Sequence, residues 1–171
     1  MPAAPPVRSV AVRVLTPIGW MQGVFVLPRM HAFVDFVEHA GPFLRIHDVR
    51  LPGRKDAVRT FVMQRNAVLL VVPEDAEHLE KAEMTASAKV AHRVSCLMEH
   101  GVVHGKLVIV ADVAIGDFLL HHSGFVVLRD CVIQLRDASK PSGRIPWLVV
   151  NAAHVIGVSE EPAMTRGRAS R

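Results

Sequence analysis

Two Asp-Phe-x-x-His stretches are the first places in this chain where side chains could do chemistry. One runs from Asp35 to His39 and the other from Asp117 to His121. A carboxylate near an imidazole can orient a general base, and both groups also bind metals. The same spacing fits a short helix, with Asp in its first turn and His in its last turn, where the helix dipole favours a cation. We favour this structural interpretation, because the pattern supplies no nucleophile, and we expect Phe36 and Phe118 to anchor the core.

Each stretch belongs to a longer internal repeat. Sliding the chain along itself aligns 12–49 with 94–131 without a gap, and a slightly larger shift aligns 61–74 with 147–160. The second copy would thus carry four extra residues, in the loop "LRDASKPSGRIP", where insertions are tolerated. We infer two copies of one unit. We assign structural roles to the positions shared by both copies, namely Gly23/Gly105, Asp35/Asp117, Phe36/Phe118, His39/His121, Phe43/Phe125 and Asp48/Asp130.

The hydrophobic pattern of each copy predicts about five short strands and one short helix. We therefore expect a mainly β fold of two tandem small barrels or rolls, at 7–74 and 89–160. The intervening 75–88 is rich in helix formers and predicts a linking helix. The basic tail, 161–171, is predicted to be disordered.

The histidines and cysteines invite a test for a metal site. Cys96, His100 and His104 recur every four residues, and His121 and His122 are adjacent. On one continuous helix the first three could hold zinc. However, the repeat places Cys96 on a strand, and the matching positions of the first copy carry no ligands. Phosphate-binding loops, nucleophile elbows and paired carboxylates are also missing from the sequence. We predict no metal, no cofactor and no enzymatic activity.

The balance of charge favours the first copy as a partner for anions. The chain carries a formal net charge of +4. Basic residues gather on and around one loop of the first copy, and they could contact phosphates: Arg45, Arg50, Arg54, Lys55, Arg59 and Arg65. A solvated hairpin loop explains the same residues without any ligand. The chain has no Tyr, which weakens stacking on single-stranded bases.

The composition favours a folded cytoplasmic protein. Half of the residues are hydrophobic and 21% are charged, which allows a buried core. No apolar run approaches the roughly 20 residues that span a bilayer, and the first residues have no signal-peptide core. Cys96 and Cys131 are too few for a disulfide framework, so reduced thiols are expected.

The segments "VDFVEHAGPFLRIHDV" and "GDFLLHHSGFVVLRDC" resemble the core of an uncharacterised bacterial family of small β domains, which brings no established activity. The resemblance covers nearly the whole chain as two copies. More remotely, the rhythm of Gly105, Leu107, Asn151 and Val155 is similar to that of Sm-like barrels, which bind RNA as rings. Sm-like proteins carry an Arg-Gly or Lys-Gly pair beside this Asn, whereas the neighbours of Asn151 are Val150 and Ala152.

These observations predict a non-enzymatic interaction module or scaffold that binds a protein partner or itself. Exposed strand edges invite such pairing. The alternative is an RNA-binding protein that uses the basic loop of the first copy.

Overall fold

The computed structural model describes residues 6–75, 79, 87–136 and 143–161. It confirms the mainly β prediction. The first half of the chain contains, in order, β1 (Val7–Thr16), β2 (Gly19–Pro28), α1 (Phe33–His39), β3 (Phe43–Arg50), β4 (Val58–Gln64), the 3-10 turn η1 (Arg65–Ala67) and β5 (Leu70–Pro73). The second half contains β6 (Lys89–Met98), β7 (Gly101–Val110), α2 (Ile115–His121), β8 (Phe125–Leu135), β9 (Ile145–Asn151), η2 (Ala152–His154) and β10 (Val155–Glu160).

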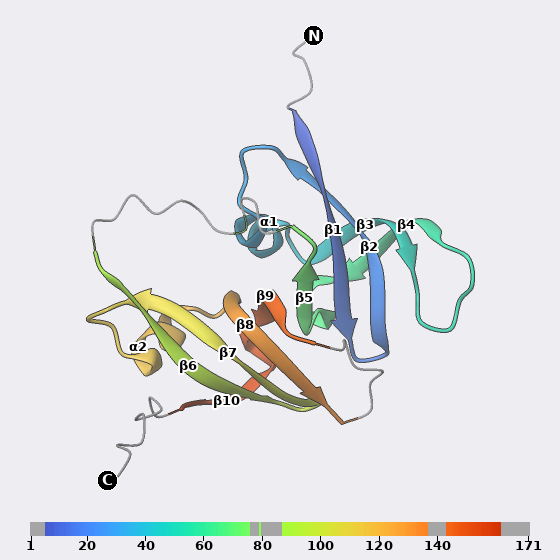
Figure 1. Ribbon diagram of the computed structural model, residues 1–171. Coiled ribbons are helices and arrows are strands. Elements are labelled where there is room, and N and C mark those ends of the chain that lie inside the picture. Colours follow the sequence, from blue (N-terminus) through green and yellow to red (C-terminus); the bar gives the residue numbers. More distant parts are fainter. Residues whose placement is uncertain (1–5, 76–78, 80–86, 137–142, 162–171) are drawn as a thin grey trace.

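The described strands form a single open antiparallel sheet in the order β10-β6-β7-β8-β9-β5-β1-β2-β3-β4. Each half keeps its strands together, and its last strand lies beside its first. The halves form two lobes that meet where β5 of the first half pairs with β9 of the second (Figure 1). The sequence predicted two tandem units but gave no indication of this pairing, which joins both halves into one sheet.

The same irregularity bends both halves. Asp48 and Asp130 have positive φ angles of 49° and 51°, a conformation that Asp tolerates better than most residues. The register of β2 against β3 shifts close to Asp48, and that of β7 against β8 shifts close to Asp130. These bulges increase the local twist of the strands, so each half curls around its own core.

The hydrogen bonds define which residues of the two halves are counterparts. Phe43 pairs with Gln64, whereas Phe125 pairs with Asn151. The second half therefore has five extra residues between these paired positions, rather than four. The alignment of 61–74 with 147–160 was wrong by one residue, because hydrophobic alternation alone cannot fix the register of an Ala- and Val-rich segment. Residues up to the β3–β4 and β8–β9 loops are matched at the same sequence separation as Phe43 and Phe125. Residues after these loops are matched at the same separation as Gln64 and Asn151.

Two expectations concern residues outside the described ones. The linking helix predicted at 75–88 lies mostly in 76–78 and 80–86, and the predicted disordered tail lies mostly in 162–171. Within the first of these segments, Leu79 is described. Its side chain is buried in the core of the first half, and its carbonyl accepts a hydrogen bond from the Val34 N–H, 3.1 Å.

Gly23 gives a direct test of how tightly β2 and β3 approach each other. A β-carbon at Gly23 would lie 2.5 Å from Ile46 Cγ2 and 3.0 Å from the His47 carbonyl oxygen. We expect Gly23→Ala to lower the free energy of unfolding by about 1–3 kcal/mol, as overpacked cores do. Urea denaturation would measure the change.

Gly116 in α2 is the matched control, because nothing lies within 4 Å of a β-carbon placed there. Gly116→Ala should leave stability unchanged or raise it by up to about 1 kcal/mol, through its higher helix propensity. Equal unfolding midpoints for the two variants would contradict the close approach of β2 and β3.

Candidate interaction surface

The two Asp-Phe-x-x-His stretches form α1 and α2, as the helical interpretation predicted. Asp35 and Asp117 lie in the first turns, and neither helix has a side-chain N-cap. The histidine Nδ1 atoms donate to backbone carbonyls one turn earlier: His39 to Asp35 at 2.8 Å and His121 to Asp117 at 2.7 Å. Because these bonds end on carbonyl oxygens rather than carboxylates, they fix the tautomer but build no base-orienting pair.

The phenylalanines of the two stretches do not play the same part in packing. Phe36 is half-buried and packs edge-on against the fully buried Phe25, with 6.0 Å between ring centroids. Phe118 is also half-buried and packs against the second core, and its ring stacks on that of His122, with 3.9 Å between centroids. The counterpart of Phe25 is Leu107, which offers no ring for an edge-on contact. Phe118 therefore packs against the second core without the ring-to-ring contact that Phe36 makes.

One hollow at the junction of the halves collects polar side chains from both. Its lining includes Glu38, Arg65, His121, His122 and Ser123. Glu38 Oε1 accepts the backbone N–H of Phe125 at 2.9 Å, and Arg65 donates to the Glu38 carbonyl. The Nδ1 atoms of both histidines donate within α2. These groups hold the junction together rather than activating Ser123.

A second polar cluster joins three residues that are far apart in the sequence. Ser95 Oγ donates to Glu161 Oε1 at 2.7 Å, and His104 Nδ1 lies 2.8 Å from Ser95 Oγ and 3.3 Å from Glu161 Oε1. The bonds from Ser95 and then His104 lower the pKa of the Glu161 carboxyl. A catalytic serine would donate to the histidine, whereas Ser95 donates to the carboxylate. The cluster therefore ties the end of β10 to β6 and β7, and its spacing gave no sequence signal.

The residues considered as zinc ligands do not converge. Cys96 is buried on β6, His100 lies in the turn before β7, and His104 belongs to the Ser95 cluster. Among the described residues, no three His, Cys, Asp or Glu side chains are grouped closely enough to hold a metal ion. The stretch is a hairpin, which puts these positions on different faces, and a helix would have been needed to align them.

Cys96 and Cys131 are buried free thiols in the core of the second half. Burial raises the pKa of Cys96 to about 11 and that of Cys131 to about 12. Both are therefore protonated near neutral pH, and a thiol is a poor nucleophile in that form.

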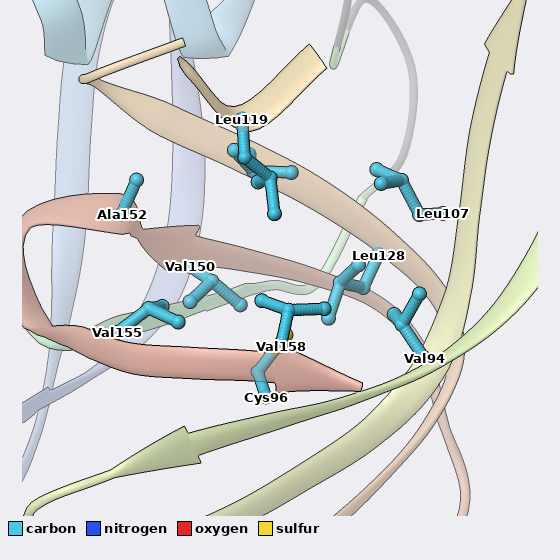
Figure 2. Close-up of a pocket in the computed structure, with 10 residues that line it drawn as sticks. Val94, Cys96, Leu107, Leu119, Leu128, Val150, Ala152, Val155 and Val158 are labelled. Carbon is cyan, nitrogen blue, oxygen red and sulfur yellow. The ribbon is translucent and has the colours of Figure 1, made fainter. Parts of the chain in front are cut away.

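A small cavity in that core is lined by aliphatic side chains and Cys96, including Leu119 of α2 (Figure 2). The two halves also fill their cores with side chains of different size. In the first half, Phe25 packs edge-on against Phe33 as well as Phe36. The counterparts of Phe25 and Phe33 are the smaller Leu107 and Ile115. The cavity offers no polar group that could orient a ligand.

The six basic residues predicted as a phosphate-binding set lie on β3, the following loop, β4 and η1. Arg45, Arg50, Arg54, Lys55 and Arg59 are exposed, whereas Arg65 is half-buried at the junction hollow. The loop after β3 projects away from the sheet (Figure 1). Exposed charges of this kind can contact an anion, but they do not form an enclosed site.

The junction itself is the most elaborate feature that sequence reasoning missed. Leu70 pairs with Val150 and Val71 with Val149 across the β5–β9 ladder. The Asn151 N–H donates to the Leu69 carbonyl at 3.0 Å, and Asn151 Nδ2 donates to the Val68 carbonyl at 2.8 Å. Because Asn151 is buried, these bonds satisfy groups that water cannot reach.

The two cores exchange side chains across this junction. Leu15, Leu69, Leu70 and Val72 of the first half pack in the core of the second half. In return, Phe125, Val127 and Val149 pack in the core of the first half. Each core is therefore completed by residues from the other half.

The counterparts of these junction residues are uncovered at the two ends of the sheet. Leu69 is 3% exposed, whereas its counterpart Ile156 on β10 is 68% exposed. Val149 is fully buried, whereas its counterpart Val62 on β4 is 55% exposed. Phe43 and Leu97, on the strands beside the end strands, are likewise exposed, unlike their buried counterparts. The two ends of the sheet thus leave exposed the apolar residues whose counterparts are buried at the junction.

Comparisons with protein-family models, with curated proteins and with solved structures give no match to this chain. Neither described helix is long and apolar enough to cross a membrane.

Asn151 allows the contribution of the junction to be measured. Asn151→Ala removes the side-chain bond to the Val68 carbonyl and another from the Ala153 N–H, 3.1 Å. We expect a loss of about 1–3 kcal/mol in the free energy of unfolding, because the Val68 carbonyl is left without its partner in a buried position. Thermal and urea denaturation would measure it.

The counterpart of Asn151 is Gln64, which is exposed at the end of β4. Gln64→Ala is therefore the matched control and should change stability by less than about 0.5 kcal/mol. A loss of equal size at both positions would show that the junction has no special role in stability.

Proposed function

We propose that this protein is a non-enzymatic interaction scaffold that binds extended protein segments at the two end strands of its sheet. Two tandem copies of one small, bent β unit, Sm-like or SH3-like in kind, would form it. The observation that carries the proposal is the exposure of Ile156 and Val62, whose counterparts are buried by strand pairing inside the same molecule.

Strand addition is the binding mode that fits these edges. An end strand has backbone N–H and C=O groups without a neighbouring strand, and an incoming extended peptide can pair with them. Apolar side chains beside the edge then add affinity and select the peptide. β4 and β10 both lie at the ends of the sheet, and both carry such side chains.

The polar clusters support a structural protein better than an enzyme. His39 and His121 donate to backbone carbonyls, Ser95 donates to a carboxylate, and the two thiols carry raised pKa values. Buried free thiols also accord with a reducing compartment, so we place the protein in the cytoplasm.

A peptide with the β9 sequence tests this proposal, because β9 covers the counterpart of β10 within the chain. A fluorescent peptide of residues 145–152, with lysines added at both ends for solubility, should bind the dilute protein. Ile156→Lys should weaken binding about tenfold, since burying the isoleucine is worth roughly 1.5–3 kcal/mol. Fluorescence anisotropy would measure the affinity.

Ile18→Lys is the matched control, since Ile18 is similarly exposed but lies in the turn between β1 and β2, which belongs to neither end strand. It should leave peptide affinity unchanged. The proposal fails if the peptide does not bind at high micromolar concentration, or if both variants bind it as the wild type does.

RNA binding is the second candidate, favoured by the exposed cations on β3, β4 and the loop between them. If this loop contacts phosphates, single-stranded RNA should bind more weakly as salt rises. Arg54→Ala combined with Lys55→Ala should make the logarithmic salt slope shallower by about 1.4, since each phosphate contact on a single strand contributes about 0.7. Anisotropy of a labelled RNA at several salt concentrations would measure the slope.

Arg136→Ala is the control for this experiment, because Arg136 is also exposed but lies in the second half. The RNA candidate is rejected if binding is undetectable near physiological salt. It is also rejected if Arg136→Ala changes the slope as much per charge as the loop variant does.

A further inference from the structure

The β5–β9 junction inside the chain indicates how the end strands of two copies could pair. It pairs β5 with β9, and their counterparts are β10 and β4, the two end strands of the sheet. We propose that β10 of one copy of this protein pairs with β4 of a second copy, antiparallel and in the register of the internal junction. This inference rests on the proposed function, because it requires end strands that accept a partner, and it names that partner.

The register follows directly from the counterpart positions. Leu70 opposite Val150 becomes Gly157 opposite Met63, and Val71 opposite Val149 becomes Val158 opposite Val62. The bond from the Asn151 N–H to the Leu69 carbonyl becomes one from the Gln64 N–H to the Ile156 carbonyl. These residues of β10 and β4 already lie in extended strands.

The exposed apolar side chains would then be buried as their counterparts are. Ile156 and Leu97 would take the places of Leu69 and Leu15, which pack in the core of the neighbouring half. On the other side, Phe43 and Val62 would take the places of Phe125 and Val149, which pack in the core of the first half. Association would thus complete both cores with residues from the adjacent copy.

The helices α1 and α2 add a contact at the internal junction and, correspondingly, between copies. Glu38 of α1 accepts the Phe125 N–H across the internal junction. The counterpart of Glu38 is Leu120 of α2, an exposed leucine. Between copies, Leu120 would approach exposed Phe43, so an apolar contact would replace the hydrogen bond.

Charge favours head-to-tail pairing over pairing of like edges. On the end strands themselves, β4 carries the exposed Arg59 and no acidic residue, whereas β10 carries the exposed Glu160 and no basic residue. Two β4 strands would bring arginines together, and two β10 strands would bring glutamates together. Opposite charges attract, and this favours pairing of β10 with β4.

The contact between copies is expected to be weaker than the internal one. Gly157 and Ser159 stand where the internal junction has Leu70 and Val72, and Arg45 stands where it has Val127. Less apolar surface is therefore buried, and association should be reversible. A head-to-tail contact leaves one open end on each side, so copies add until a ring closes or a filament grows.

Paired cysteine variants test both the partner and the register. Gln64 and Ile156 are exposed and would face each other between copies. Their counterparts are joined by one backbone hydrogen bond, from the Asn151 N–H to the Leu69 carbonyl. Cα atoms of opposed antiparallel residues lie about 4.5–5.5 Å apart, within reach of a disulfide. One full-length chain carries Gln64→Cys, the other carries Ile156→Cys with an affinity tag, and both are mixed and oxidised. The buried native thiols should react slowly, which the wild type checks.

We expect the tagged heterodimer to form at least tenfold more than either homodimer. Formation of the Gln64→Cys or the Ile156→Cys homodimer instead, or of no crosslinked product at concentrations up to about 1 mM, overturns the inference. If the 145–152 peptide still binds in that case, the proposed function stands and only the second copy is excluded as the partner.

An uncrosslinked measurement keeps the result independent of disulfide chemistry. Sedimentation equilibrium of the wild type should show association that Val62→Lys weakens about tenfold, because a buried valine would become a charge. Val90→Lys is the matched control, since Val90 is also an exposed strand valine but lies outside the segment of β6 that pairs with β10. Equal association of both variants, or a wild type that stays monomeric, overturns the inference.

Discussion

The pairing of β5 with β9 is the interaction on which the rest of this structure depends. Without it, each half would end in an uncovered strand and an incomplete core, because Leu69 of one half and Val149 of the other are buried in the opposite core. The backbone and side-chain bonds of Asn151 fix this pairing in one register. The same requirement explains why the two ends of the sheet, where no such partner is present among the described residues, carry exposed apolar side chains.

Within each half, bending decides the shape of the core. The positive φ of Asp48 and Asp130, each opposite a glycine that leaves no room for a β-carbon, turns the strands around an apolar interior. The halves then fill that interior differently. Three aromatic rings pack together in the first half, whereas the second has the smaller Leu107 and Ile115 at two of these positions and contains a small cavity lined in part by Leu107. The two halves therefore share one backbone pattern although their cores are packed differently.

The sequence predicted the strand content and both short helices because these depend on local spacing. The histidines of the Asp-Phe-x-x-His stretches lie in the last helical turn, as the dipole argument expected. The β5–β9 contact left no such local signal, since the alternation of apolar residues in a strand does not say which neighbour it has. The 3-10 turns η1 and η2 were also not predicted. The Ser95, His104 and Glu161 cluster needed the fold to bring its members together.

The junction also imposes an order of events during protein synthesis. Leu70 and its partner Val150 are separated by nearly half of the chain. At about 5–20 residues per second, a ribosome needs on the order of 4–16 seconds to supply the second strand after the first. For that interval β5 is an open edge beside a core that lacks Phe125 and Val149. Nascent chains on neighbouring ribosomes would expose the same edge together, so association of first halves competes with correct pairing until β9 emerges.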